Sequence, residues 1–419
     1  MAKKASIGIE VGESNSIFNI IKNVDKSTEI LSKCDTAVIK DYIDSGNYIL
    51  NACLTGSIFK GAPAGRVVTL AGPSGCGKSY LALSFCRNAQ KKGYTPLYLD
   101  SESAIDIEFV KRLGCDPNNF ILKQVNTIRE VSSLIANICK SLLDLPEKER
   151  ENNKMIIVLD SLGNLTSDKE FNDTLEGNEK RDMTKQQEIK ALFRANATAL
   201  GKLGIPFIIC SHTYQTLDLY SKSVVSGGTG LSYNASLTLM MSTSKYEDKD
   251  SEKIVSNKVG DYTKLGVTVT AKPEKSRFTI PQKVQFYIPY FKAPNPYIGL
   301  EKYLTWENSG ILEGILLSKK DYDKLGDKEK ETVKIFEKDG QTFYAFPKVA
   351  AITKNRTIVV SHLGAQLPLG ELFSSKVLTD EILHKIDDEV IRPEFELPSQ
   401  DSFDDLSEFV DTETGEILK

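Results

Sequence analysis

The chain has 419 residues, of which 40% are hydrophobic and 26% charged, as is usual for a globular protein with a large core. This length suits one large domain with smaller additions, or two to three domains. No run of about 18 apolar residues is present, which excludes a membrane span, and the segment Met1 to Lys4 lacks the apolar core of a signal peptide. The seven dispersed cysteines show no zinc-ligand spacing, so we expect reduced thiols and a cytoplasmic location.

The net charge of −4 hides an uneven distribution. Twelve acids and two bases follow Lys385, so the rest of the chain carries a net charge of +6. An acidic end of this kind is most often a disordered, solubilising tail, which we place at residues 390–419. The alternative is a tail that competes with DNA for the mildly basic body.

The first periodic pattern in the chain is formed by Ile17, Ile20, Ile21 and Val24, at positions i, i+3, i+4 and i+7. The spacing predicts a short amphipathic helix. Its apolar face either packs on the core of its own chain or docks on a neighbouring subunit, and the sequence alone leaves both open.

A phosphate-binding loop comes next. The apolar run 67–71 leads into Gly72-Pro73-Ser74-Gly75-Cys76-Gly77-Lys78-Ser79, which fits G-x-x-x-x-G-K-[ST], and a helical pattern follows from Ser79 to Gln90. Glycines let backbone N–H groups turn inward around phosphate oxygens, and the helix N-terminus adds positive potential. We expect Lys78 to reach the β- and γ-phosphates and the Ser79 hydroxyl to hold Mg²⁺, with Tyr80 closing the nucleotide-binding segment.

Two carboxylates follow predicted strands. The strand 96–100 is followed by Glu102, our candidate to orient or deprotonate a water, although a lone loop acid is more simply a solvated one. A helical pattern from Ile128 to Leu145 precedes Lys154 and the apolar run 155–159, which is followed by Asp160. A buried strand with an acid at its tip is the pattern by which P-loop ATPases meet Mg²⁺ through water.

Two polar loops are expected to leave this edge of the sheet. The first lies in 164–190, which is charge-rich without clean periodicity, and is followed by a helix at about 183–203. A strand at 205–210 ends at Ser211 and His212, and a glycine-rich polar stretch follows up to Gly230. Bases in or beside the loops interleave with acids, so the basic signal is weak. They are Lys180, Arg181, Lys185 and Lys222.

The remaining patterns complete the predicted fold. Alternation at 237–241, 267–270 and 284–287 predicts a late antiparallel addition, with 272–277 connecting the last two strands. We therefore predict an α/β fold with a mostly parallel twisted sheet flanked by helices. The expected divisions are an N-terminal segment (1–35), a P-loop core (36–295), a small α/β domain (296–389) and the acidic tail (390–419). A single phosphate loop argues against a tandem two-motor helicase.

Several of these segments together resemble the phage UvsX branch of the RecA recombinase family. The resemblance runs from about residue 36 to 305, and residues 306–385 match poorly. The phosphate loop is generic to P-loop ATPases, whereas the His-Thr-Tyr and Glu-Lys-Ser-Arg segments make the resemblance specific. The segments are Asp160-Ser161-Leu162-Gly163-Asn164-Leu165, Asp182-Met183-Thr184, Leu192-Phe193-Arg194, Ser211-His212-Thr213-Tyr214-Gln215-Thr216, Gly227-Gly228-Thr229-Gly230 and Glu274-Lys275-Ser276-Arg277.

The resemblance implies a RecA-type core that hydrolyses ATP with Mg²⁺. Subunits of the family assemble head to tail on single-stranded DNA into a helical filament, with ATP held between neighbours. The filament pairs its strand with homologous duplex DNA and exchanges strands. The implied partners are both forms of DNA, further copies of the chain, and single-strand-binding and mediator proteins, in the host cytoplasm if the chain is encoded by a phage.

The resemblance also implies roles for residues around the nucleotide. Glu102 fits the catalytic glutamate that positions the attacking water, and Asp160 fits the acid on the Mg²⁺ side. His212 lies where RecA proper has a glutamine that senses the γ-phosphate, and a histidine, unlike glutamine, can titrate near neutral pH. Asp106 and Phe109 match positions that contact adenine and stack on it.

Two further sets of residues are assigned by the resemblance alone. Lys275 and Arg277 resemble cations that reach the γ-phosphate of the neighbouring subunit, although without it they would read as ordinary surface bases. The polar loops at 166–186 and 213–229 resemble the DNA loops of the family, which grip the backbone with little sequence preference. The candidate DNA contacts are Arg181, Lys185, Lys222, Gly227 and Gly228.

Two other functions compete with a strand-exchange ATPase. A hexameric helicase-like motor would share the phosphate-loop chemistry and form closed rings. A recombination mediator that no longer hydrolyses ATP is disfavoured by the intact phosphate loop and carboxylates. The family polymerises through its N-terminal region, which favours the 17–24 helix as a filament contact.

Overall fold

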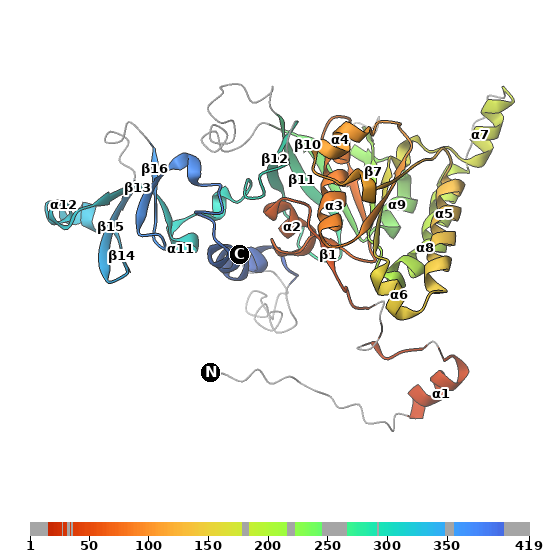
Figure 1. Cartoon of the computed structure of the whole chain (residues 1–419), viewed down its shortest axis with the longest axis horizontal. Helices are drawn as coiled ribbons and strands as arrows, with labels where there is room; N and C mark the ends of the chain where they lie inside the picture. The colour runs from red at the N-terminus through yellow and green to blue at the C-terminus, as the bar shows by residue number, and fades with distance from the viewer. Residues whose placement is uncertain are drawn as a thin grey trace, which may run out of the picture.

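The computed structural model describes residues 16–26, 28–31, 34, 37–177, 184–215, 223–244, 266–290, 293–347 and 356–397. Within these residues the core is an eight-stranded sheet in the order β12-β11-β10-β3-β7-β6-β4-β5 (Figure 1). The strands from β10 to β5 run parallel, and β11 and β12 are added antiparallel at one edge, as predicted for 267–270 and 284–287. The strand at 237–241, which the alternation groups with them, is β10 and runs parallel to β3. Their bounds are β3 (Val67–Ala71), β4 (Thr95–Asp100), β5 (Ile121–Gln124), β6 (Met155–Asp160), β7 (Phe207–Ser211), β10 (Leu237–Thr243), β11 (Gly266–Ser276) and β12 (Val284–Pro289).

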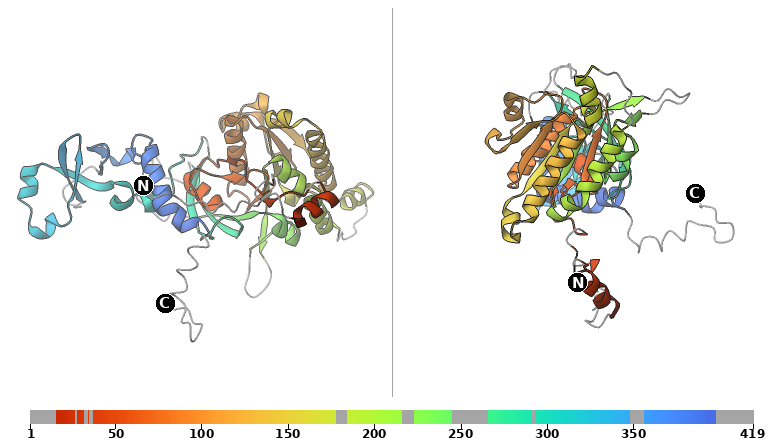
Figure 2. Two further views of the ribbon diagram at one scale, coloured as in Figure 1. Left: turned by 90° about the horizontal axis from the view of Figure 1, so that it is seen from below. Right: turned by 90° about the vertical axis from the view of Figure 1, so that its right-hand side faces the viewer.

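Helices cover both faces of this sheet. Alternate residues of a strand point to opposite faces, so Val68 and Leu70 of β3 join the core under α3, while Val67 and Ala71 join the core under α5 and α8. Figures 1 and 2 show α5 and α8 side by side on that second face. Burial on both faces explains why the parallel strands read as nearly continuous apolar runs. The helices around the sheet are α3 (Lys78–Lys91), α4 (Ile107–Arg112), α5 (Ile128–Leu143), α6 (Glu147–Asn152), α8 (Lys185–Leu203) and α9 (Gly228–Asn234).

Two local expectations are corrected by the structure. Strand β11 continues to Ser276, so the stretch from Lys272 onward is part of a strand and not a connection. The polar stretch after Asp160 contains a helix, α7 (Asp168–Leu175), whose start is capped because the Ser167 side chain accepts a hydrogen bond from the Glu170 N–H. The segment leading to the glycines at 227 and 228 forms a hairpin of β8 (Thr213–Gln215) and β9 (Ser223–Val225).

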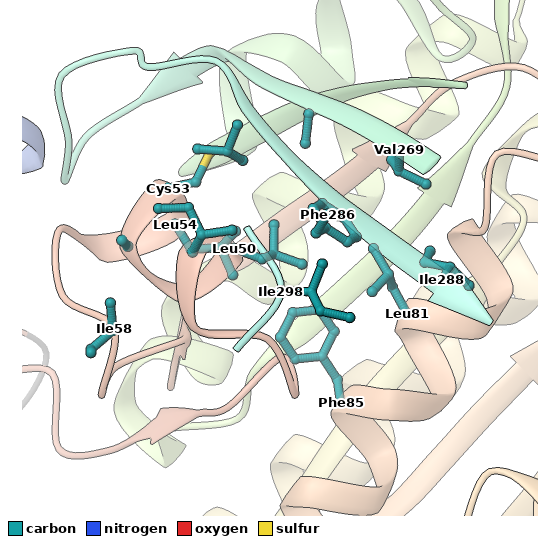
Figure 3. Packing of buried hydrophobic residues seen from close by; sticks show 14 of the residues in the cluster. Leu50, Cys53, Leu54, Ile58, Leu81, Phe85, Val269, Phe286, Ile288 and Ile298 are labelled. Atoms are coloured by element: carbon teal, nitrogen blue, oxygen red, sulfur yellow. The ribbon is translucent and has the colours of Figure 1, made fainter. Parts of the chain in front are cut away.

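A buried helix, α2 (Tyr48–Thr55), shares a hydrophobic cluster with β12 and the middle of α3. α2 follows the hairpin strand β1 (Tyr42–Ile43) and precedes its partner β2 (Ala62–Pro63). Figure 3 shows Leu50 and Leu54 from α2 facing Phe286 of β12, with Phe85 of α3 completing the cluster. The middle of α3, which follows the phosphate loop, therefore packs on the same buried cluster as α2 and β12.

The chain after β12 forms a second, antiparallel sheet. Its order within the described residues is β14-β15-β13-β16-β17, and short helices lie in the connections around these strands. Residues 296–303 still pack on α2, because the Asn47 side chain donates to the Ile298 carbonyl oxygen and Tyr303 is buried, so the expected boundary at 295 is not a break in packing. The elements are α11 (Trp306–Ser309), β13 (Ile311–Leu317), α12 (Lys319–Asp323), α13 (Asp327–Lys330), β14 (Lys334–Lys338), β15 (Gln341–Pro347), β16 (Thr357–Val360) and β17 (Ala365–Pro368).

The end of the described chain returns to the core. α14 (Asp380–Ile386) continues through a π-helical turn into α15 (Arg392–Phe395). The fully buried Asp387 carboxylate accepts hydrogen bonds from the Ser57 hydroxyl at 2.7 Å and from the Ile58 N–H at 2.8 Å. Phe395 is fully buried, and its carbonyl oxygen accepts from the Ile280 N–H. The prediction that a tail begins at residue 390 is therefore wrong for residues 390–397, and residues 398–419 lie outside the described part.

The N-terminal helix stands clear of the core. α1 (Ser16–Val24) forms where the periodicity predicted it, and Figures 1 and 2 show it apart from the sheet and its helices. Its apolar residues Ile17, Ile20, Ile21 and Val24 are between 45% and 85% exposed, so they do not pack on the core of their own chain. Across the part of the chain that is described, no helix has the length and apolar character to cross a membrane.

Candidate nucleotide-binding and hydrolysis site

The loop between β3 and α3 has the backbone of a phosphate cradle. Gly75 and Gly77 have φ of +76° and +89°, in the left-handed region that favours glycine. A Cβ at Gly77 would lie 2.4 Å from Cδ1 of Ile288, and one at Gly72 would lie 2.5 Å from the carbonyl oxygen of Met241. Glycine is thus required at both positions, and the loop fits the phosphate groups of a nucleotide at the N-terminus of a 14-residue helix.

Some side chains of the loop are exposed to solvent and others are buried. Pro73, Ser74 and Gly75 are exposed, and Ser79 is half-buried in the first turn of α3. Lys78 is buried, and its Nζ donates to the carbonyl oxygens of Gly72 at 2.9 Å and Pro73 at 2.8 Å, which holds the ammonium group on the loop.

Two residues of the expected nucleotide segment point inward. Cys76 and Tyr80 have side chains buried in the core between α3 and the sheet. Burial raises the pKa of the Cys76 thiol. Either residue can therefore reach a phosphate only through its backbone, and their assignment as nucleotide contacts stays a prediction.

Asp160 ends β6 beside the loop. Its carboxylate is only 4% exposed, and the Tyr98 hydroxyl donates to Oδ2 at 2.6 Å. Burial, and then the Asp160 charge, raise the pKa of the Tyr98 phenol well above its usual value, so the hydroxyl keeps its proton. The Ser79 hydroxyl and the Asp160 carboxylate are oxygen donors of the kind that suits Mg²⁺.

Glu102 lies just past the end of β4 and is held by two donors. The Ser161 hydroxyl donates to Oε1 at 2.7 Å, and His212 Nε2 lies 2.9 Å from the same oxygen. Burial acts to raise the pKa of Glu102, but the bonds from Ser161 and His212 and the charges of His212 and Lys78 outweigh it, so the pKa is lowered. The carboxylate is therefore ionised and oriented, as a group that positions a water must be.

Ser101 joins the ends of the two strands that carry these acids. Its Oγ donates to the Ser161 carbonyl oxygen at 2.7 Å and accepts from the Ser161 N–H at 2.9 Å. Strands β4 and β6 pair in register so that Asp100 lies opposite Asp160. The position of Ser161, and through it that of Glu102, is thus fixed by the sheet.

Asp106 and Phe109 belong to α4, which follows the Glu102 turn. The Asp106 side chain caps this helix by accepting from the Phe109 N–H at 2.8 Å, and the Phe109 ring is half-buried against the core. Their expected contact with adenine remains a prediction.

The two polar loops meet next to His212, which lies beside Glu102. The Lys185 ammonium donates to the Gly163 carbonyl oxygen at 3.1 Å, and a Cβ on Gly163 would lie 3.4 Å from Cδ2 of His212. Gly227 and Gly228 have φ of +115° and +60°, and a Cβ on Gly228 would lie 2.5 Å from Oε1 of Gln186. Both loops therefore touch the start of α8. The remaining candidates, Arg181 and Lys222, lie outside the described residues.

A cavity beside these glycines adds two bases that the sequence reasoning missed. It has a volume of about 390 Å³ and lies between α8 and α9. Lys190 and Arg194 line it one helical turn apart, and their i, i+4 spacing was the available signal. The other lining residues are Gln187, Gly230, Tyr233 and Asn234.

Lys275 and Arg277 lie far from the phosphate loop of their own chain. The Arg277 N–H donates to Ser236, whose N–H donates to Val67 at the start of β3. Val67 is five residues before Gly72, which is about 16 Å along a strand. The Lys275 Nζ donates to the Tyr233 carbonyl oxygen at 2.8 Å, and burial, with the charge of Arg277, lowers the pKa of Lys275.

The parallel sheet, the phosphate loop and the two strand-end carboxylates define an α/β P-loop domain of the RecA type. The family model described as the RecA N-terminal domain matches residues 14–280. The chain therefore belongs to the RecA family.

Three relatives illustrate the extent of the similarity. The "Recombination and repair protein" of Enterobacteria phage T4 is 31% identical over 265 residues, which are 62% of each chain. "Protein RecA" of Crocosphaera subtropica is 27% identical over 276 residues, covering 64% of this chain and 70% of the relative. "Protein RecA" of Mesoplasma florum is 24% identical over 289 residues, covering 68% and 78%. The match thus spans less than two thirds of the length of the phage protein.

Proposed function

We propose that this chain is an ATP-dependent homologous recombinase that assembles on single-stranded DNA into a helical filament and exchanges strands with homologous duplex. Family membership and the similarity to a phage recombination and repair protein support this proposal. The observation that carries it is the hydrogen-bonded path from Glu102 to His212, whose carbonyl oxygen accepts from the Ser226 N–H in the second polar loop. Such contacts suit an enzyme in which hydrolysis and DNA binding depend on each other.

Different groups of the site bind the triphosphate, orient the water and hold the metal. Backbone N–H groups of the loop and the Lys78 ammonium bind the triphosphate, and the ionised Glu102 orients a water for in-line attack. Ser79 directly, and Asp160 through water, would hold Mg²⁺, which neutralises charge on the β- and γ-phosphates when bound. His212 lies beside Glu102, and its carbonyl oxygen accepts from the Ser226 N–H, so it is suited to sense the γ-phosphate and relay its presence.

The site is completed by a second copy of the chain. Arg277 and Lys275 lie at the far end of the sheet from their own phosphate loop, which supports a role at the γ-phosphate of a neighbour. Cations supplied in this way stabilise the charge of the transferred phosphoryl group and tie hydrolysis to assembly. The exposed apolar face of α1 supports the same conclusion, because a helix face of this kind needs a partner.

The DNA surface is proposed around the start of α8. Lys185, Gly227 and Gly228 lie close together there, and the cavity lined by Lys190 and Arg194 extends the cationic surface. Cations and backbone N–H groups without base-reading side chains fit binding to phosphates with little sequence preference.

Electron microscopy with ATP and single-stranded DNA tests the proposal. Helical filaments that need both ligands, together with DNA-stimulated ATP turnover, are expected. Closed rings with directional unwinding would indicate a hexameric motor instead. Filaments or complexes without any ATP turnover would indicate a mediator, and either outcome would overturn the proposal.

A further inference from the structure

Tyr98 is a buried residue without a role in the hydrolysis proposed above. It lies on β4, and the β4–β6 register puts it opposite Val158, on the sheet face that also carries Asp160. The Tyr98 side chain is fully buried, and its hydroxyl reaches Oδ2 of Asp160 at 2.6 Å. The two residues are 62 positions apart in the sequence, so the sheet alone brings them together.

The ring of Tyr98 is a rigid support for this hydroxyl. It stacks on Phe120, with ring centroids 5.9 Å apart and planes inclined by 28°. A fully buried, stacked ring keeps one rotamer, because the surrounding core leaves no room for another. The hydrogen bond therefore ties the Asp160 carboxylate to a ring that cannot move aside.

We infer that Tyr98 is a positioning residue whose hydroxyl fixes the Asp160 carboxylate and so sets the Mg²⁺ dependence of nucleotide binding. The inference rests on the proposed function, in which Asp160 is the acid on the Mg²⁺ side. Residues that hydrogen-bond to the ligands of a metal orient those ligands. Losing one such residue typically weakens metal affinity about 10- to 100-fold. Asp160 acts through water, so the lower end of that range is expected.

The chain offers a matched control in Tyr94. This residue directly precedes β4, is only 4% exposed, and donates from its hydroxyl to Oδ2 of Asp41 at 3.0 Å. Tyr94→Phe removes the same kind of tyrosine–aspartate hydrogen bond at the opposite end of the same strand. A purely structural role for Tyr98 predicts the same behaviour in both variants.

The test measures binding of a fluorescent ADP analogue to the full chain while Mg²⁺ is titrated. Tyr98→Phe is expected to raise the Mg²⁺ concentration for half-maximal binding about tenfold, whereas Tyr94→Phe shifts it less than about twofold. Thermal unfolding of both variants measures the structural cost, and analogue binding without Mg²⁺ should match the wild type. A Tyr98→Phe midpoint equal to that of Tyr94→Phe overturns the inference.

Three further outcomes are decisive. If Tyr98→Phe does not fold, Phe120→Leu, which loosens the ring but keeps the hydroxyl, takes its place, and an unchanged Mg²⁺ midpoint overturns the inference. A wild-type chain that binds no analogue at any Mg²⁺ concentration overturns the proposed function and the inference with it. Mg²⁺-dependent binding in the wild type with no shift in the variants overturns the inference alone.

Discussion

Replacing Ser161 by alanine should slow ATP hydrolysis without weakening ATP binding. The substitution removes the hydroxyl that donates to Oε1 of Glu102 at 2.7 Å and keeps the backbone bonds to Ser101. Ser161 is fully buried and is not part of the phosphate loop. We therefore expect a lower kcat, while the KM for ATP changes little.

The magnitude follows from the chemistry of the lost bond. A hydrogen bond to a charged group contributes about 1.5–3 kcal/mol net. The Glu102 side chain is 28% exposed and keeps the bond to His212, so water and His212 partly replace the lost donor. A loss of about 1.4–2 kcal/mol at the transition state corresponds to roughly a 10- to 30-fold fall in kcat.

The same substitution should change the pH dependence of turnover. Glu102 acts as a carboxylate, and its pKa in the folded chain lies below the usual 4.5 because the hydrogen bonds and nearby cations outweigh burial. A lowered pKa keeps the acid ionised as pH falls, and the stability that it contributes is lost only when pH falls through the lowered value. Losing the Ser161 donor raises the pKa, so the acid limb of kcat should move to higher pH.

Steady-state ATPase assays with saturating single-stranded DNA give kcat and KM separately over a pH series. Ser309→Ala is the matched control, since the buried Ser309 hydroxyl also donates over 2.7 Å, to the carbonyl oxygen of Thr305 just before α11. Ser309→Ala should leave kcat and its acid limb unchanged. A Ser161→Ala kcat within about twofold of the wild type would refute the positioning of Glu102 by this bond.

Three further changes have definite expected outcomes. Gly77→Ala should weaken nucleotide binding and lower the unfolding temperature more than Gly93→Ala does. Both glycines have a left-handed φ (+89° and +79°), which costs alanine about 1–2 kcal/mol, but of the two only a Cβ at Gly77 would also have to displace Cδ1 of the buried Ile288, 2.4 Å away; equal losses in the two variants would contradict this. Lys275→Ala should abolish DNA-stimulated turnover and leave nucleotide binding by the monomer intact, and equal loss of both would show that Lys275 does not serve a neighbour. Deleting residues 398–419 should strengthen DNA binding at moderate salt, and an unchanged salt midpoint would make the tail a solubiliser only; the cut falls after Phe395 because that ring is buried.

Local patterns were sufficient to predict the sheet core and the phosphate loop. The apolar runs ending at Ala71, Asp100 and Asp160 became parallel strands because burial on both faces demands such runs. The glycine loop was predictable because its chemistry needs residues that are adjacent in sequence. The neighbours of Gly72 and Gly77, which are Met241 and Ile288, were not predictable from the loop because they lie on strands far along the chain.

Groups that act through the fold were not predictable in the same way. Ser161 and His212 contact Glu102 across 59 and 110 residues, and no local pattern encodes such pairings. Charge counting failed at the C-terminus for a related reason. Asp387 counts as one acid among twelve in the sequence, but in the structure it is fully buried and hydrogen-bonded to Ser57.

A set of contacts between two sites does not by itself transmit a signal, since coupling needs an element that both sites can bias. Glu102 is suited to this because its Oε1 accepts from Ser161 and lies within hydrogen-bond distance of His212. Any movement of the carboxylate towards a water must change both contacts together. Both lead to the turn at Gly163, whose carbonyl oxygen is held by Lys185 at the start of α8. The coupling energy between substitutions at Ser161 and His212, measured with and without DNA, is therefore the quantity that separates communication from mere proximity.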